Sequence, residues 1–351
     1  MLDLAKLQNR HWTLAERPVA GVEDRHFRLE TSPVPQPGEG EFVVRTLFLS
    51  LAPVMRRYMI DGAGIEPPMA IGDTMYGRGV GEVVASNNPD FAVGDCVHGK
   101  LGWQEFALTD GGEDKLMFKV SERGVPPYLF LGALGITGYS AYFGLLDISL
   151  PKAGETVLVS GAAGGVGSVV GPLAKLHGCR VIGIAGSDEK CALLTDRLRY
   201  DAAINYRGGN IEEAIGAAAP DGIDVFFDNV GGEILDAALI HLNRYARITS
   251  CGRISQYIDD DYALKNWALI GGNRAKLEGF FVYDYRDRFS EAERDLAKWH
   301  REGKLPVLVD IVEGLEAMPS ALMRLYDGAN VGKQVVKVAD PLFLPKDAAA
   351  A

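Results

Sequence analysis

The sequence contains little cysteine and no long hydrophobic run. Its 351 residues include four cysteines, Cys96, Cys179, Cys191 and Cys251. They form no C-x-x-C pair and no Cys/His cluster with the spacing of zinc ligands, so we expect free, mostly buried thiols and no metal site. No run of 18 or more apolar residues is present, and polar residues interrupt the opening stretch MLDLAKLQNRHW. The sequence therefore predicts neither a transmembrane helix nor a signal peptide, and we expect a cytoplasmic protein.

The sequence also lacks an excess of positive charge. It has 36 Lys and Arg against 47 Asp and Glu, which gives a formal net charge of -11. This balance argues against a partner with a phosphate backbone, such as a nucleic acid, and against an anionic membrane surface. Because 47% of the residues are hydrophobic and 24% are charged, the composition is that of an ordinary globular protein.

The pattern of apolar residues changes near residue 126. Up to about residue 125, short apolar runs alternate with Gly and Pro at roughly ten-residue spacing, which predicts a small barrel or sandwich. From Pro126 to about residue 250, predicted strands and helices alternate, as in a parallel sheet with right-handed crossovers. The segment 308–338 adds a strand, a helix and a last strand. At this length two domains are expected.

A glycine-rich turn separates a predicted strand from a predicted helix in VLVSGAAGGVGSVVGPLAK, residues 157–175. A G-x-x-G-x-G match alone is weak evidence, but its place inside a strand–helix–strand unit is typical of a dinucleotide site. Glycines allow the tight turn, and backbone N–H groups at a helix N-terminus attract a pyrophosphate. We expect a dinucleotide to bind at this turn.

The end of the next strand indicates which dinucleotide binds. NAD enzymes usually place an acidic residue there, facing the ribose hydroxyls. Here the strand ends in Gly186 and Ser187, Lys190 follows one turn into the helix, and the strand after that ends at Tyr206. This arrangement favours the extra 2′-phosphate of NADP. Asp188 leaves NAD as the alternative, although an aspartate in the first turn of a helix commonly supports that helix.

Ten segments in order along the chain match the motifs of one family. With them the chain resembles the zinc-independent medium-chain dehydrogenase/reductases, and within these the prostaglandin, 2-alkenal and curcumin reductases. The resemblance covers nearly the whole length. The segments are NRHWTLAERPVAG (9–21), NPDFAVGDCVHG (88–99), GWQEF (102–106), GALGITGYSAYFGLLDI (132–148), SGAAGGVGSVVG (160–171), AGSDEK (185–190), FFDNVGGE (226–233), CGRISQY (251–257), EGFFVYDY (278–285) and ANVGKQVVK (329–337).

The resemblance implies an α/β fold in which a doubly wound Rossmann domain is inserted in a GroES-like β-barrel catalytic domain. The Rossmann domain would be 126–311, and the catalytic domain 1–125 plus 312–351. It also implies NADPH-dependent reduction of a carbon–carbon double bond conjugated to a ketone or aldehyde, in a homodimer paired along 274–282. The cofactor-binding residues carried over by motif are Gly164, Gly165, Val166, Gly167, Ser187, Lys190, Tyr206, Asn229, Cys251, Gly252, Ile254, Ser255, Tyr257, Phe280, Phe281, Val282 and Asn330.

The family reading needs a proton donor for the enolate that forms as the double bond is reduced. Tyr257 is the first candidate, Tyr58 is the second, and the nicotinamide ribose hydroxyl is a third. The segment Ala52–Met59 lacks the first tyrosine of the family motif D-P-Y-M-R-G-R-M, so no particular enone is predicted. Three alternatives stay open: a quinone reductase of the same superfamily, an enzyme that also oxidises alcohols, and a non-catalytic NADPH-binding protein.

Overall fold

The computed structural model describes residues 2–61, 67–120, 124–257 and 262–344. The chain divides into two compact units. The first unit consists of Met1–Leu131, Asp310–Asn330 and Gln334–Ala351. The second consists of Gly132–Val309 together with Val331–Lys333. The chain thus leaves the first unit once, forms the second, and returns.

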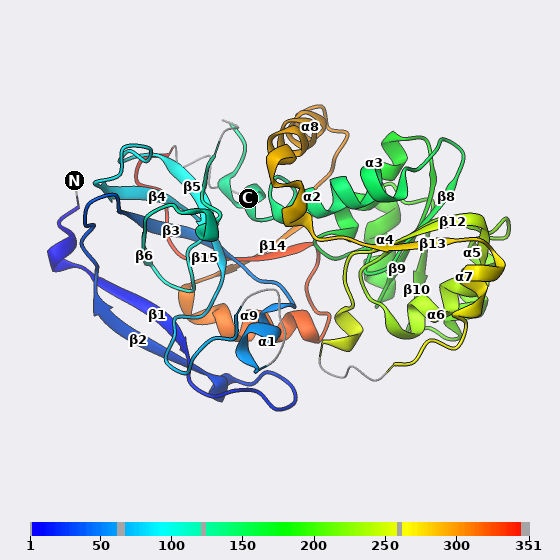
Figure 1. The fold of residues 1–351 in the computed structure, drawn as a ribbon, viewed down its shortest axis with the longest axis horizontal. Coiled ribbons are helices and arrows are strands. Elements are labelled where there is room, and N and C mark those ends of the chain that lie inside the picture. The colour runs from blue at the N-terminus through cyan, green and yellow to red at the C-terminus, as the bar shows by residue number, and fades with distance from the viewer. Residues whose placement is uncertain (1, 62–66, 121–123, 258–261, 345–351) are drawn as a thin grey trace. The chain divides into compact units, whose positions relative to one another are not determined.

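The second unit is built on a six-stranded sheet with the order β10-β9-β8-β11-β12-β13 (Figure 1). All of its strand pairs are parallel. The chain runs outward from β8 in one direction and from β11 in the other, so the order of strands reverses between β8 and β11. Ligands of such sheets bind at this reversal, beyond the carboxyl ends of the strands. The strands are β8 (Thr156–Val159), β9 (Arg180–Ala185), β10 (Ala202–Asn205), β11 (Ile223–Asp228), β12 (Leu242–Ser250) and β13 (Lys276–Gly279).

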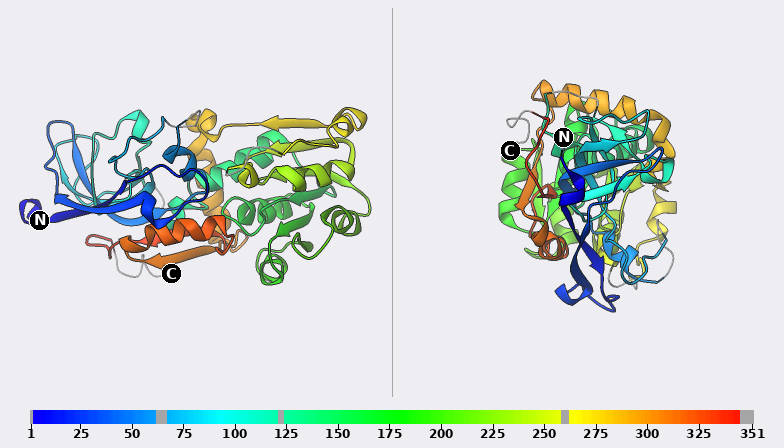
Figure 2. Two further views of the ribbon diagram at one scale, coloured as in Figure 1. Left: turned by 90° about the horizontal axis from the view of Figure 1, so that it is seen from below. Right: turned by 90° about the vertical axis from the view of Figure 1, so that its left-hand side faces the viewer.

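Helices cover both faces of this sheet (Figure 1 and Figure 2). Helices α5, α6 and α7 pack on the face that carries Leu158, Ile182, Phe226 and Ile248. Helices α2, α3 and α8 pack against one another on the other face. The central strands are therefore apolar on both sides, as their sequences predict. The helices are α2 (Ile136–Phe143), η5 (Gly144–Ser149), α3 (Gly167–Leu176), α4 (Asp188–Asp196), α5 (Ile211–Ala218), α6 (Gly232–Ile240), η6 (Ile254–Gln256), α7 (Ala268–Gly272), η7 (Val282–Arg288) and α8 (Phe289–Arg301).

The first unit holds a seven-stranded sheet with the order β14-β15-β3-β4-β5-β7, in which β6 also pairs with β3. Strand β3 has partners on both edges, and eight of its nine residues are buried. Gly81 lies on β4 opposite an irregularity in β3, where a Cβ would lie 2.3 Å from the Arg45 carbonyl oxygen. The strands are β3 (Phe42–Ser50), β4 (Arg78–Ser86), β5 (Cys96–Lys100), β6 (Phe106–Thr109), β7 (Phe118–Lys119), β14 (Val309–Glu313) and β15 (Lys333–Lys337).

The remaining elements of the first unit surround this sheet. The antiparallel pair β1–β2 forms a separate two-stranded ribbon, drawn in blue in Figure 2. A second core, rich in methionine and aromatic side chains, packs between this ribbon, the sheet and helix α9. The elements are η1 (Leu4–Lys6), β1 (Gln8–Leu14), η2 (Asp24–His26), β2 (Phe27–Pro33), α1 (Met55–Met59), η3 (Glu113–Lys115), η4 (Pro127–Leu131), η8 (Leu315–Ala317) and α9 (Met318–Tyr326).

The expected fold class is confirmed: a parallel Rossmann sheet interrupts a unit built on an antiparallel sheet. In the structure the chain passes between the units at 131/132 and 309/310, and the short stretch Val331–Lys333 belongs to the second unit. Among the helices that the structure describes, none is long and apolar enough to cross a membrane.

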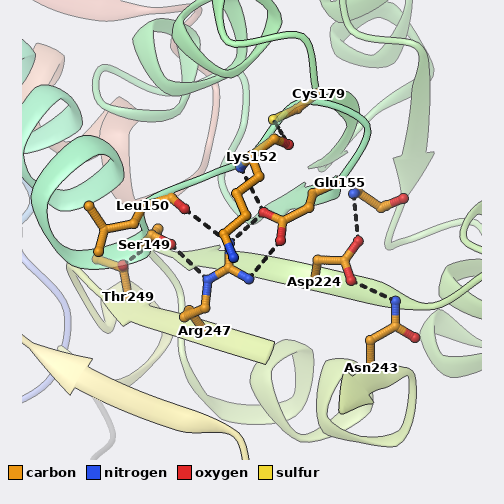
Figure 3. Close-up of polar contacts among 10 residues, drawn as sticks. Ser149, Leu150, Lys152, Glu155, Cys179, Asp224, Asn243, Arg247 and Thr249 are labelled. Carbon is orange, nitrogen blue, oxygen red and sulfur yellow. Dashed lines mark hydrogen bonds and ion pairs between the residues drawn. The ribbon is translucent and has the colours of Figure 1, made fainter. Parts of the chain in front are cut away.

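A polar network ties together the amino-terminal ends of β8, β11 and β12 (Figure 3). The Arg247 guanidinium donates to Glu155 Oε1 at 2.9 Å and to the Ser149 carbonyl oxygen at 2.8 Å. Asp224 accepts from the Thr156 backbone N–H and from the Asn243 amide, at 2.9 and 2.8 Å. The network therefore fixes the amino-terminal ends of these strands. Ligands of such sheets bind at the opposite, carboxyl ends.

Removal of the arginine from this network should destabilise the second unit. The Arg247 and Glu155 side chains are only 21% and 19% exposed, so Arg247→Ala leaves a largely buried carboxylate and two carbonyl oxygens without their donor. We expect a loss of about 2–3 kcal/mol in the free energy of unfolding at pH 7. Calorimetry should show a clear fall in Tm. Arg294→Ala removes an arginine that is 66% exposed and should leave Tm nearly unchanged.

The same pair should make the stability pH-dependent. Burial alone would raise the pKa of Glu155, but the Arg247 hydrogen bonds and the Lys152 backbone N–H hold it below its usual value of 4.5. The stabilisation is therefore complete above pH 4.5 and is lost as the pH falls through the lowered pKa. The difference in Tm between the wild type and Arg247→Ala should shrink in this acidic range. A constant difference would contradict the role of the ion pair.

Candidate functional site

The turn from β8 into α3 is too tight for any side chain at Gly167. A Cβ at this position would lie 2.4 Å from the Gly161 carbonyl oxygen and 2.6 Å from the Ala162 Cα. Within the part of the chain that the structure describes, the backbone N–H groups of Val166 and Gly167, which follow Gly165, donate no hydrogen bond. Two unpaired donors at the start of a helix form a cradle for an anionic group. The geometry fits the expected pyrophosphate. Gly164 comes just before these residues, and its N–H donates to the Gly161 carbonyl oxygen within the turn.

The stretch that follows Asn330 packs on this glycine turn. The Gly332 N–H donates to the Ala163 carbonyl oxygen at 2.7 Å, and Gly332 pairs with Gly164 as an isolated parallel bridge. The Lys333 side chain lies 3.4 Å from the place where Gly165 would carry a Cβ. The stretch Val331–Lys333 thus helps to shape the cradle. Asn330 itself is buried and belongs to the first unit.

The carboxyl ends of β9 and β10 carry the three residues expected at the 2′-phosphate. The two strands pair with Ala185 opposite Asn205, so Gly186–Ser187 and Tyr206 follow side by side. The Lys190 backbone N–H donates to the Ser187 hydroxyl oxygen at 3.3 Å, which caps α4. The Tyr206 ring lies 3.1 Å from the place of a Gly186 Cβ. Folding therefore gathers Ser187, Lys190 and Tyr206 at one edge of the sheet.

In the structure Asp188 has a partner within the protein. Its carboxylate accepts a hydrogen bond from the Asn205 side-chain amide at 2.8 Å. Asn205 Oδ1 in turn accepts from the Arg207 backbone N–H, and the Arg207 guanidinium lies over the Tyr206 ring at 5.6 Å from its centre. Asp188 therefore links the first turn of α4 to the end of β10, and an arginine that sequence reasoning missed adds a cation to this end of the site. A basic residue directly after Tyr206 was the available signal.

The carboxyl ends of β11 and β12 form the other end of the site. The Asn229 side-chain amide donates to the Ser160 carbonyl oxygen at 2.8 Å and so joins the ends of β11 and β8. The residues after β12 fold back on the same place, because the Ile254 N–H donates to the Asn229 carbonyl oxygen at 3.3 Å. The predicted residues Cys251, Gly252, Ile254, Ser255 and Tyr257 all lie in this one turn.

Burial gives the Cys251 thiol no nucleophilic character. Burial first, and the charge of Asp228 second, raise the pKa of Cys251 to about 12. The thiol therefore stays protonated at neutral pH. Covalent chemistry would require the thiolate. Tyr257, at the end of the same turn, is half-buried. Its hydroxyl is the acid–base group that sequence reasoning expected here.

Phe280, Phe281 and Val282 follow β13 directly. Phe280 packs against Gly144 of η5, where a Cβ would lie 2.8 Å from its ring. Phe281 is 37% exposed and Val282 is buried. Tyr58 lies in the first unit on helix α1, is half-buried, and meets Tyr76 edge-to-face at 5.8 Å between ring centres.

Sequence reasoning also passed over Asp228, which ends β11. This aspartate is 1% exposed and accepts hydrogen bonds from the Ser160 hydroxyl and from the Val230 and Gly231 backbone N–H groups. Burial raises the pKa of Asp228, whereas these donors act in the opposite direction. A charged residue at the end of a buried strand was the signal that could have found it.

No group of three or more His, Cys, Asp or Glu side chains in the described ranges could hold a metal ion. His98 illustrates why a histidine need not be a ligand. It is buried between the Phe118 and Phe130 rings, and burial lowers its pKa to about 3. The imidazole is neutral at physiological pH and serves as a packing residue.

Two family models match the chain. The one described as the N-terminal domain of oxidoreductase covers residues 10–117, and the one described as zinc-binding dehydrogenase covers residues 165–298. Among curated proteins, the NADPH-dependent curcumin reductase of Escherichia coli (strain K12) is 40% identical over 95% of this chain and 98% of its own length. The NADP⁺-dependent 2-alkenal reductase of Nicotiana tabacum is 40% identical over 86% of this chain and 88% of its own.

A solved structure agrees over the same length. CurA from Vibrio vulnificus in complex with NADPH matches with a TM-score of 0.89 and 39% identity. The match covers 95% of this chain and 100% of that one. The residues that the structure gathers at the carboxyl ends of β8, β9 and β10 are the ones that the sequence analysis assigns to such a nucleotide.

Lys190 allows a direct test of cofactor preference. Lys190→Ala should weaken binding of NADPH far more than binding of NADH, by about 1.5–3 kcal/mol, because a charged hydrogen bond to the 2′-phosphate is lost. Titration of each cofactor against the variant measures this. Arg180→Ala, at the exposed amino end of the adjacent strand β9, is the matched control and should change neither affinity. An equal loss for NADPH and NADH would contradict the assignment.

Proposed function

The chain belongs to the zinc-independent medium-chain dehydrogenase/reductases, and we propose that it reduces the carbon–carbon double bond of α,β-unsaturated ketones and aldehydes with NADPH. One observation carries this proposal. The chain combines a built dinucleotide site at the sheet reversal with 40% identity to curcumin and 2-alkenal reductases over most of its length. The second unit binds the cofactor, and we propose that the first unit is the catalytic domain.

The chain's own residues hold the cofactor at both ends. The free N–H groups of Val166 and Gly167 would bind the pyrophosphate, with Gly164 and Gly165 forming the turn beside it, and Lys190 with Tyr206 would bind the 2′-phosphate. The turns that follow β11 and β12 border the nicotinamide half. When bound, NADPH supplies a hydride equivalent; the protein has to orient the substrate, exclude water and manage charge and protons.

Negative charge develops on the carbonyl oxygen of the substrate as its double bond is reduced. A hydroxyl that hydrogen-bonds to this oxygen stabilises the charge and can deliver the proton. We propose the Tyr257 hydroxyl for this role, with Tyr58 or the cofactor ribose as the alternative donors. No metal is required for this step, because the conjugated alkene is the softer acceptor and the oxygen needs only a hydrogen bond.

The product of one reaction tests the enzyme class. With benzalacetone and deuterium-labelled NADPH, the deuterium should appear on the carbon that bears the phenyl ring, and the product should be the saturated ketone. An allylic alcohol with the double bond retained would overturn the proposal. Faster turnover of menadione than of any enone would favour the quinone reductase, and no acceptor-dependent oxidation of NADPH would favour a binding protein.

The same assay tests the proton donor. Tyr257→Phe should lower kcat at least tenfold and leave the affinity for NADPH nearly unchanged, because a positioned general acid contributes about 10²–10⁴ in rate. Tyr245→Phe is the control, since Tyr245 is 62% exposed and lies in β12 outside the turn. A smaller effect of Tyr257→Phe would move the role to Tyr58 or the ribose hydroxyl.

We also propose a homodimer in the cytoplasm. Among the described residues, β13 pairs with β12 alone, so its other edge is open. An open edge in an otherwise covered sheet pairs readily with a second copy across a two-fold axis. Sedimentation at micromolar concentration should give twice the chain mass of 37.9 kDa. A monomeric mass would count against this part of the proposal.

A further inference from the structure

Asp228 lies where three strands of the parallel sheet end. Its carboxylate accepts the Ser160 hydroxyl at 2.7 Å, the Val230 N–H at 3.0 Å and the Gly231 N–H at 3.0 Å. Gly231 also approaches the second carboxylate oxygen, at 3.1 Å. The donors belong to the end of β8 and to the turn that follows β11. One buried side chain therefore holds these two segments together.

The backbone of the same residue holds the third segment. The Asp228 carbonyl oxygen accepts from the Cys251 N–H at 2.8 Å and from the Gly252 N–H at 3.2 Å. The next residues continue the attachment, because the Ser255 hydroxyl and N–H both donate to the Val230 carbonyl oxygen, at 2.6 and 3.2 Å. The turn that ends in Tyr257 is thus bonded to the very loop that the Asp228 carboxylate shapes.

We propose that Asp228 is a positioning residue for the nicotinamide half of the site: its carboxylate fixes the loop Asn229–Gly231, and through that loop the turn Cys251–Tyr257. This inference rests on the proposed function and adds a residue to it. Among the described residues, Asp228 has no hydrogen bond to Tyr257, the first of the predicted acids. It acts through the backbone of its neighbours.

The chemistry of the surrounding groups requires a carboxylate at this position. Every group that faces its oxygens is a donor: two backbone N–H groups and one hydroxyl, which itself accepts the Asn229 N–H at 2.8 Å. All three donors bond to Oδ1, and Oδ2 accepts only the second contact of the Gly231 N–H. An ionised carboxylate only accepts, whereas an amide whose oxygen replaces Oδ1 would point its NH₂ group at the Gly231 N–H. Asp228→Asn therefore keeps the volume and breaks the pattern.

The adenosine half of the cofactor site does not depend on Asp228. Its residues Ser187, Lys190 and Tyr206 follow β9 and β10. The Lys190 N–H bonds to the Ser187 hydroxyl, the Tyr206 ring lies against Gly186, and Asn205 bonds to Asp188 beside them. A positioning defect at Asp228 should therefore weaken NADPH without weakening a ligand that lacks nicotinamide. A general loss of structure would weaken both.

The experiment compares two ligands and three variants. Dissociation constants for NADPH and for adenosine 2′,5′-bisphosphate are measured by calorimetry on the wild type, Asp228→Asn, Ser160→Ala and Glu82→Gln, with Tm for each. Glu82 is the matched control. It is a fully buried carboxylate in the first unit that accepts three backbone N–H groups, from Leu342, Phe343 and Leu344.

In Asp228→Asn we expect the affinity for NADPH to fall about tenfold, the affinity for adenosine 2′,5′-bisphosphate to change less than about twofold, and kcat with benzalacetone to fall at least tenfold. Ser160→Ala, which loses one bond to the carboxylate, should shift the ratio of the two affinities in the same direction. Glu82→Gln should lower Tm and leave that ratio unchanged. If Asp228→Asn does not fold, Ser160→Ala decides.

The inference would be overturned if the ratio of the affinities for NADPH and adenosine 2′,5′-bisphosphate were unchanged in Asp228→Asn and Ser160→Ala. An equal loss of affinity for both ligands gives such an unchanged ratio. The proposed function is tested separately, by the product that the wild type forms from benzalacetone and by its rate with menadione. The two binding constants require no turnover and are independent of the substrate.

Discussion

The site depends on how closely helix α3 approaches strand β8. At Gly167 the helix backbone lies so near the preceding turn that a Cβ would overlap the Gly161 carbonyl oxygen, and at Gly171 it would lie 2.1 Å from the Tyr200 ring. The Tyr200 hydroxyl then donates to the Gly167 carbonyl oxygen at 2.7 Å, which secures the first turn of the helix. Because the helix starts this close to the sheet, its unpaired N–H groups point beyond the strand ends. The remaining residues of the site are placed relative to that cradle.

Features that are local in the chain, such as this close turn, could be predicted from the sequence. The turn at residues 161–167 is a local structure, and glycines between an apolar strand and an apolar helix reveal it directly. The parallel sheet was equally visible, because strands such as VLV and VFF are apolar on both faces. The motif match along the chain assigned Ser187, Lys190 and Tyr206 for the same reason: each lies at the end of a predicted strand or in the first turn of a predicted helix.

The contacts that sequence reasoning missed join residues far apart in the chain. Asp188 accepts a hydrogen bond from Asn205, 17 residues away, and this contact exists because β9 and β10 pair with Ala185 opposite Asn205. The importance of Asp228 comes from Ser160, which is 68 residues away. A sequence pattern can show that a strand ends in a polar residue. The register of the neighbouring strand decides what that residue binds.

Buried carboxylates recur in this chain in a form that suits positioning better than catalysis. Asp228 and Glu82 are both buried, and both are held by backbone N–H groups. A backbone donor is fixed by the chain itself, so a carboxylate surrounded by such donors holds loops at defined distances, whereas a flexible lysine would tolerate a range of them. The Glu82 carboxylate holds the backbone of residues 342–344 against strand β4 of the antiparallel sheet. At Asp228 the same device lies beside the reacting half of the site, where small displacements of a bound group cost the most in rate.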